Sequence, residues 1–147
     1  MKKLFRILVV ALAVVTAFSS CQKDEEEITN TLTVRGSTLK IRMALYAKYE
    51  DYYNFDLDAG GEDSGLHGYG GFDASWVGKT TDLKGRFFMS FNPQAGGSSI
   101  DPVIKSGTVS ITEVKGGLHV VVDAIEEGGE KLKLNVLAED ETKKVWD

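Results

Sequence analysis

The odd and even positions between 39 and 49 differ in character. Every odd position there is apolar or aromatic, whereas the charged residues Lys40, Arg42 and Lys48 all occupy even positions. Successive side chains of a strand point to opposite faces of its sheet, so this pattern predicts a strand whose odd residues face the core. A helix with Ile41 and Leu45 on one face is the alternative, but it leaves the apolar residues between them unexplained.

The odd-numbered pattern continues from Tyr53 to Leu57 after a polar turn at positions 50 and 51. Two alternating segments joined by a short polar turn predict a hairpin. In this register Tyr49 faces the core with the other odd residues, whereas Tyr46 and Tyr52 point to the opposite face.

Glycine pairs separate the apolar segments in the last third of the chain, at positions 116–117 and 128–129. Tight hairpin turns need a positive φ, which glycine adopts without steric cost, so these pairs predict an antiparallel meander. Together with the hairpin above, the alternation predicts about eight strands. The others lie near residues 32–35, 66–77, 87–91, 108–112, 118–124 and 132–138.

The composition is that of a packed domain, because 42% of the residues are hydrophobic and 10% are aromatic. These fractions argue against a disordered stalk. Short strands separated by turns roughly every 8–12 residues are typical of all-β sandwiches and barrels. We therefore expect residues 29–147 to form a single antiparallel β-sandwich or small barrel.

The first twenty residues have the composition of a secretory signal peptide. Lys2, Lys3 and Arg6 form a basic start, and residues 7–18 carry no charge. This apolar stretch is too short to cross a hydrocarbon core about 30 Å thick as a helix. Residues 1–20 are therefore predicted to be cleaved from the mature chain.

Small residues precede Cys21, the only cysteine in the chain. The sequence from Ala17 to Cys21 resembles the lipobox of bacterial lipoproteins. This resemblance implies cleavage before Cys21 once its sulfur carries a diacylglycerol, and two or more acyl chains hold a protein stably on a membrane. A free cysteine in an exported protein is the alternative, and a disulfide within the chain is excluded.

A lysine and an acidic run follow the cysteine almost at once: Lys23, Asp24, Glu25, Glu26 and Glu27. This run resembles the signal that exports lipoproteins to the outer face of the outer membrane in gut-dwelling and gliding Gram-negative bacteria. It implies a lipid-anchored protein displayed on the cell surface, and a periplasm-facing protein is the alternative. Like charges repel one another, so residues 21–28 are also predicted to form a disordered tether.

Acidic residues outnumber basic ones by 22 to 17, and loss of the signal peptide moves the formal net charge from −5 to about −8. Nucleic-acid binding depends on Lys and Arg residues that neutralise phosphates, so we expect no nucleic-acid partner.

Two histidines are the first residues to consider for catalysis. The sequence has no HExxH motif, no cysteine pair and no Gly-x-Ser-x-Gly motif that would join them in a catalytic or metal site. We expect His119 to be a structural strand residue, His67 to lie in a glycine-rich loop, and the protein not to be an enzyme.

The segment from position 56 to 63 is the best metal candidate. Calcium takes six to eight oxygen ligands on flexible loops that contain glycine. Asp56, Asp58, Glu62 and Asp63 flank a glycine pair there, although their spacing is not that of an EF-hand. A solvated acidic turn is the alternative, and no other cofactor is expected.

Eight aromatic residues lie between positions 46 and 76. A flat ring offers a large contact area at a low entropic cost, and both sugar and protein recognition use it. Tyr46, Tyr52, Tyr69 and Trp76 are therefore predicted as possible ligand-binding residues. The alternative is that the sheets or loops of the sandwich cover these rings.

The whole chain resembles the small β-domain lipoproteins of such bacteria, with a lipobox, an acidic tether and a Gly-Thr-Val-Ser-Ile-Thr strand at positions 107–112 before two Gly-Gly hairpins. This resemblance implies no activity. We expect a non-enzymatic interaction or structural module of the cell envelope, whose protein or glycan partner is unidentified. A carbohydrate-binding accessory domain that uses exposed aromatic residues is the second expectation.

Overall fold

The computed structural model describes residues 26–86 and 88–144. The predicted signal peptide, Cys21 and the part of the export signal from Lys23 to Glu25 lie outside these residues. Nine strands and two short 3-10 helices form the fold. They are β1 (Thr31–Val34), β2 (Ser37–Tyr49), β3 (Tyr52–Ala59), β4 (Leu66–Asp73), η1 (Ala74–Trp76), β5 (Lys79–Asp82), β6 (Met89–Pro93), β7 (Ile104–Val114), β8 (Gly117–Glu126), β9 (Lys131–Asp140) and η2 (Glu141–Lys143).

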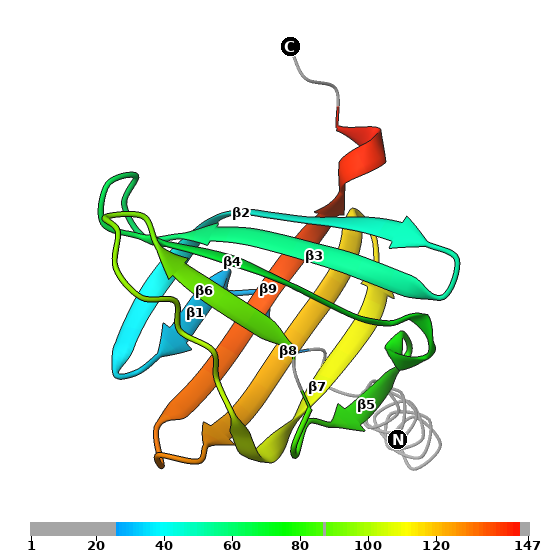
Figure 1. The fold of residues 1–147 in the computed structure, drawn as a ribbon. Coiled ribbons are helices and arrows are strands. Elements are labelled where there is room, and N and C mark those ends of the chain that lie inside the picture. The colour runs from blue at the N-terminus through cyan, green and yellow to red at the C-terminus, as the bar shows by residue number, and fades with distance from the viewer. Residues whose placement is uncertain (1–25, 87, 145–147) are drawn as a thin grey trace, which may run out of the picture.

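The strands form one sheet in the order β5-β7-β8-β9-β1-β2-β3-β4-β6. All neighbours in this order are antiparallel, and β2 also makes a short parallel pairing with β9. The sheet is not closed, because β5 and β6 stand at its two ends. Figure 1 shows how it folds over itself, so that β2, β3, β4 and β6 cross in front of β1, β9, β8 and β7. The predicted antiparallel all-β fold is thus confirmed, with nine strands in a sandwich-like arrangement.

The long strand β2 belongs to both layers. Its first residues pair with β1, and its residues from Ile41 onward pair with β3. A bulge between Ile41 and Met43 marks the passage from one layer to the other. A bulge adds one residue to a strand and bends it, and a shift of one residue exchanges the two faces.

This bulge makes the predicted register of β2 wrong beyond Ile41. Opposite residues of paired strands share a face, and Tyr46 lies opposite the buried Phe55. Tyr46 therefore faces the core, where its ring lies 5.7 Å from that of Tyr53. Tyr49, predicted to face the core, is instead 57% exposed on the outer face. The sequence pattern did not reveal the bulge, because residues 43–47 are all apolar or aromatic and are therefore compatible with either register.

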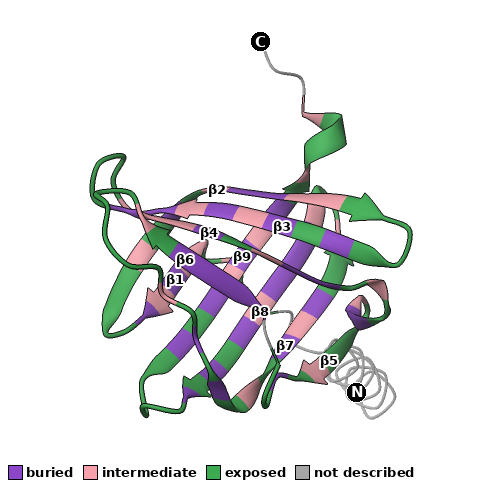
Figure 2. Ribbon diagram, in the orientation of Figure 1, coloured by how far each residue is buried: buried purple, intermediate pink, exposed green. Residues whose placement is uncertain are grey.

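The core lies between the two layers, and both contribute to it. In Figure 2 buried and exposed residues alternate along most strands, as expected for a sheet with one packed face. Aromatic rings fill the side of the core under β3 and β4, where Tyr53 and Phe72 stack with their centroids 5.0 Å apart. The front layer is therefore a packed, rigid support for whatever lies on its outer face.

The segment between β5 and β6 connects the two ends of the sheet. Its Leu83 N donates to the Gly107 carbonyl of β7, and its Phe88 carbonyl accepts from Gly71 N of β4. The open side of the sandwich is in this way bridged by backbone hydrogen bonds, although the two edge strands do not pair.

Candidate functional site

The outer face of β2, β3, β4 and β6 carries the most unusual surface among the described residues. The strand registers set its side chains in four rows. Starting from the β2–β3 turn, the rows are Tyr49, Tyr52 and Asp73; Ala47, Asn54 and Gly71; Leu45, Asp56, Tyr69 and Ser90; and Met43, Asp58, His67 and Asn92. We call the part formed by Tyr49, Tyr52, Asn54, Asp56, Asp58, His67 and Tyr69 the aromatic face.

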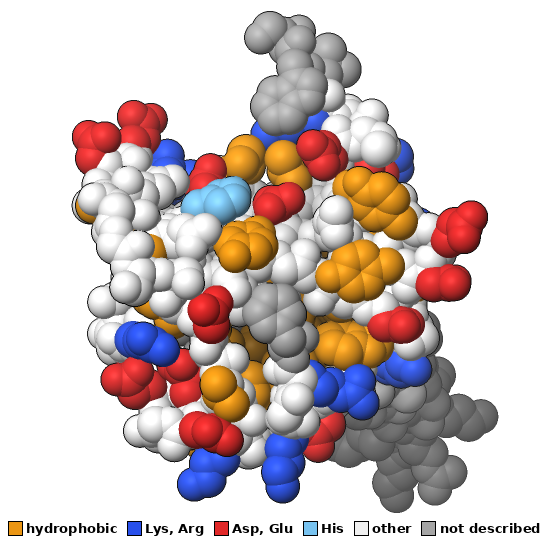
Figure 3. Space-filling model, in the orientation of Figure 1, with side chains coloured by type: hydrophobic (Ala, Val, Ile, Leu, Met, Phe, Trp, Pro, Cys, Tyr) orange, Lys and Arg blue, Asp and Glu red, His pale blue; other side chains and the backbone are white. Residues whose placement is uncertain are grey.

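Large hydrophobic side chains are exposed at five described positions, and three of them lie on this face: Tyr49 at 57%, Tyr52 at 45% and Tyr69 at 43%. Figure 3 shows this side of the molecule, with several separate hydrophobic side chains and acidic ones between them. The rings are thus spread over the face and alternate with hydrogen-bonding groups.

The ring of Tyr52 lies across the sheet instead of standing out from it. A Cβ added to Gly71 on the neighbouring strand would collide with Oη and Cζ of Tyr52. The hydroxyl end of the ring therefore lies directly over the backbone of Gly71. The ring therefore leans along the sheet while 45% of the residue stays exposed.

His67 connects the second exposed ring to the carboxylates. It lies in β4, and the prediction that it occupies a loop is wrong. Its Nδ1 lies 2.8 Å from Asp58 Oδ1, and its ring stacks on that of Tyr69 with 22° between the planes. An ionised carboxylate only accepts hydrogen bonds, so Nδ1 donates to it. In the neutral imidazole Nε2 is then an acceptor, and it lies 3.9 Å from Asp56 Oδ1.

A cleft of about 470 Å³ opens where β2 passes over β9. We call it the β2–β9 cleft. Asp58 lines it and also belongs to the aromatic face, so the two surfaces are continuous. Its charged lining residues are Arg42, Asp58, Glu139 and Lys144. Two acidic and two basic side chains balance one another there.

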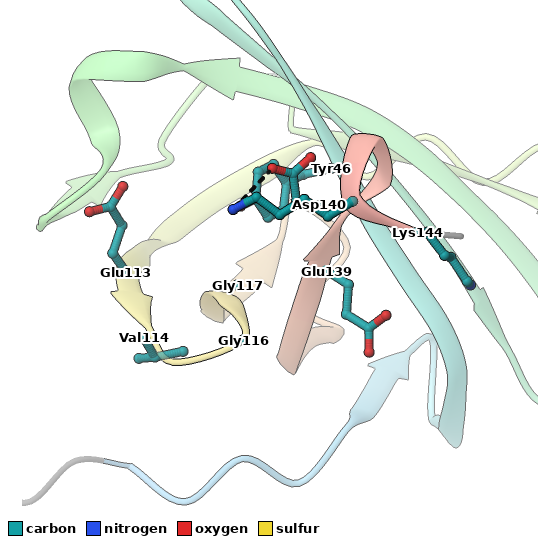
Figure 4. A pocket seen from close by; sticks show the side chains of 9 residues that line it. Tyr46, Glu113, Val114, Gly116, Gly117, Glu139, Asp140 and Lys144 are labelled. Carbon is teal, nitrogen blue, oxygen red and sulfur yellow. Dashed lines mark ion pairs between the residues drawn. The ribbon is translucent and has the colours of Figure 1, made fainter. Parts of the chain in front are cut away.

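A second cleft, of about 420 Å³, lies on the other side of the β2–β9 crossing and is lined by Tyr46, Glu113 and Asp140 among others. Figure 4 shows Tyr46 beside Asp140, whose Oδ2 is 3.8 Å from Lys143 Nζ. Burial, followed by the nearby Asp140 carboxylate, raises the pKa of Tyr46. Hydrogen bonding from Thr142 lowers the pKa of Asp140. Tyr46 is therefore a neutral hydroxyl beside a carboxylate at neutral pH.

The four carboxylates predicted as a metal site are divided between two places. Asp56 and Asp58 lie on the aromatic face, whereas Glu62 and Asp63 are exposed in the β3–β4 turn. Within residues 26–86 and 88–144, no three His, Cys, Asp or Glu side chains are placed to hold a metal ion.

Two of the four predicted ligand-binding aromatics, Tyr52 and Tyr69, lie on the aromatic face. The other two lie elsewhere: Tyr46 packs against the core and lines the second cleft, and Trp76 is 9% exposed, so a role for them in ligand binding stays a prediction. Trp76 is covered on one side by Arg86, whose guanidinium carbon is 5.5 Å from the ring centroid. Tyr49 and His67 also lie on the aromatic face, and no local signal in the sequence identified them as candidate binding residues.

His119 lies in β8 as predicted, and it is buried on the outer side of the back layer. Its Nε2 is 3.0 Å from Asn135 Oδ1. Asn135 Nδ2 donates to the Glu27 carbonyl, and Thr29 N donates to Asn135 Oδ1. These bonds attach the N-terminal end of the described chain to β9, two residues before the predicted start of the domain.

No protein-family model, no curated protein and no solved structure matches this chain. No helix in the described part of the chain combines the length and the apolar character of a membrane span. The aromatic face and the sequence that precedes the domain are therefore the features that point to a function.

Proposed function

We propose that this chain is a lipid-anchored, non-enzymatic binding module of the cell envelope, displayed on the outer face of the outer membrane. It binds its partner through the aromatic face. The observation that carries this proposal is the gathering of Tyr49, Tyr52 and Tyr69, all exposed, on one face of one layer. Exposed apolar groups concentrated on one side of a domain mark interaction sites.

The attachment of the chain to the fold supports the same proposal. Asn135 holds Glu27 and Thr29 on the outer side of the back layer, opposite the aromatic face. Glu27 follows Cys21 by six positions, and an extended chain spans at most about 3.5 Å per residue, or about 21 Å. A short link to the back layer supports a placement in which the aromatic face lies on the side away from the membrane.

Protease treatment of intact cells tests the display. A surface-displayed domain is released or degraded by an added protease, whereas a periplasmic marker protein survives. Cys21→Ala is the matched variant, because it removes the lipidation site and should move the protein from the membrane fraction to the soluble fraction. Survival of the domain on intact cells, with degradation only after lysis, would refute surface display.

Carbohydrate binding is the second candidate, and the position of Tyr52 over Gly71 favours it. A ring that lies along a surface offers its flat side to the apolar side of a sugar ring, and Asn54, Asp56 and His67 offer hydrogen-bonding atoms beside it. A panel of immobilised glycans tests this candidate. Binding that is lost in Tyr52→Ala supports it, and a panel without any hit on the folded protein rules it out.

A further inference from the structure

We propose that the aromatic face and the β2–β9 cleft form one extended site for an uncharged oligosaccharide, with its chain lying along β3. This inference rests on the carbohydrate-binding candidate above and adds the length and the charge of the ligand. Four observations carry it: the continuity of the two surfaces, their length, the order of ring and polar groups along them, and the balance of charge.

The two surfaces meet at Asp58. This residue accepts a hydrogen bond from His67 on the aromatic face and lines the cleft together with Arg42 and Met43. Leu45 also lines the cleft, and it stands in the same row of the sheet as Asp56 and Tyr69. A chain that lies across the aromatic face therefore reaches the cleft without leaving the surface.

The length of the site exceeds a single sugar ring. Tyr52 and Asp58 are six residues apart on β3, and a strand rises about 3.3 Å per residue, so about 20 Å separates them. The cleft widens the site sideways, across β2 to Glu139 of β9, which lies beside Leu45. Several sugar units in a row are needed to occupy this length.

The groups along the site suit a sugar chain. The exposed ring of Tyr52 lies at one end, and the Tyr69–His67 stack, with centroids 6.3 Å apart, provides a second aromatic surface further along. Asn54 lies in the row between them, and Asp56 lies beside Tyr69 in the next row. Sugar hydroxyls both donate and accept hydrogen bonds, so they can pair with the Asp56 carboxylate and with His67 Nε2.

The charges of the site favour an uncharged ligand over a charged one. The Asp58 carboxylate is already bonded to His67, and that of Asp73 accepts from Ser75 N. The cleft balances Arg42 and Lys144 against Asp58 and Glu139. Asp56 repels an acidic polymer, as does the excess of acidic residues in the whole chain. A basic peptide, in turn, meets Arg42 and Lys144 in the cleft, and one of the two carboxylates of the aromatic face, that of Asp58, is already bonded to His67.

Calorimetric titration of the intact lipoprotein in detergent with neutral hexose oligomers of increasing length tests the proposal. We expect the affinity to rise with each added unit until the face and the cleft are filled, and then to level off. Tyr52→Ala should weaken binding of the long oligomers by about tenfold, the loss expected for one ring contact worth about 1.4 kcal/mol. Arg42→Ala should weaken only the oligomers long enough to reach the cleft.

Ile125→Ala is the matched control, because Ile125 is an exposed apolar residue of β8, in the other layer. It should leave every affinity unchanged, and urea denaturation of each variant verifies that it is folded. Affinity that does not depend on oligomer length, or equal binding of polyuronic oligomers, overturns the extended neutral site while carbohydrate binding itself stands. Binding of a basic peptide with no response to any carbohydrate overturns both proposals.

Discussion

The Tyr52 ring occupies the space that a side chain on Gly71 would take. Gly71 lies diagonally across from Tyr52 on the neighbouring strand, opposite Asn54, and even a methyl group there would collide with the hydroxyl end of the ring. The backbone of Gly71 needs no unusual conformation, since its φ is not positive. The absence of a side chain is therefore explained by close approach, and the orientation of the ring depends on it.

Gly71→Ala should lower the free energy of unfolding by about 1–3 kcal/mol, the usual cost of an added group in a packed site. The new Cβ meets two obstacles, the Tyr52 ring and the Tyr53 carbonyl oxygen. Tyr52→Ala removes the first obstacle but not the second. In a double-mutant cycle followed by urea denaturation, Gly71→Ala should therefore cost less in the Tyr52→Ala background. Equal costs in both backgrounds would show that the ring does not lie over Gly71 in solution.

Asn135→Ala should destabilise the fold by about 1–3 kcal/mol, because buried His119 and two backbone groups lose a hydrogen-bond partner together. Loss of these hydrogen bonds should also release Glu27 and Thr29 from β9, so we expect faster hydrogen exchange at Thr29 N. Asn92→Ala, at an exposed position of β6, is the control and should change stability by less than about 0.5 kcal/mol. Unchanged exchange at Thr29 would contradict the role given to Asn135.

The strands that alternation predicted are those with one buried and one exposed face. In β3, β8 and β9 the core residues recur at every second position, and that local rule suffices to find them. β5 was missed because Lys79–Asp82 contains no apolar residue. It is a strand through its backbone pairing with β7, a contact between residues distant in sequence.

The aromatic face was only half predictable for similar reasons. The bulge after Ile41 exchanged the faces of β2, so that Tyr49 came to lie beside Tyr52. The glycines around His67 suggested a loop. Gly68 and Gly70 nevertheless lie in β4, where neighbouring groups approach their backbone too closely to leave room for a side chain. Gly68 lies under the side chains of Leu57 and Met89, and Gly70 lies against the Phe88 carbonyl. Such close approaches are set by tertiary packing, which a single sequence does not display.

Alkaline pH should destabilise the fold in part through Tyr46. Burial, together with Asp140, raises its pKa in the folded state above the ordinary value of about 10. A raised pKa means that the folded state binds the phenolic proton more tightly. The resulting stability is fully present below pH 10 and is lost as the pH rises through the folded-state pKa.

Tyr46→Phe keeps the ring and removes the titrating group, so its free energy of unfolding should fall less steeply above pH 10 than that of the parent. The measurement is a series of urea denaturation curves at increasing pH. Tyr49→Phe is the matched control, because Tyr49 is an exposed tyrosine of the same strand. If the two variants gave the same curves, burial of Tyr46 would have no part in the alkaline loss.

Arg35 holds a backbone conformation that favours glycine, with φ of 46°, in the two-residue turn that it forms with Gly36 between β1 and β2. A left-handed conformation costs a residue with a side chain about 1–2 kcal/mol. Arg35 Nη2 lies 3.7 Å from Oε1 of Glu126, which is 5% exposed and whose Oε2 has no hydrogen-bond partner among the described residues. The strained turn thus places a positive charge beside a buried negative one.

Arg35→Gly should accordingly relieve the turn and still lower stability, by about 1–3 kcal/mol, because it leaves the Glu126 carboxylate buried without its cation. Adding Glu126→Gln to this variant removes the unpaired charge and should recover most of the loss, as measured by urea denaturation at neutral pH. Two results would count against the argument. An Arg35→Gly variant more stable than the parent would mean that turn strain outweighs the ion pair, and a double variant no better than the single one would mean that Glu126 is not the group that needs Arg35.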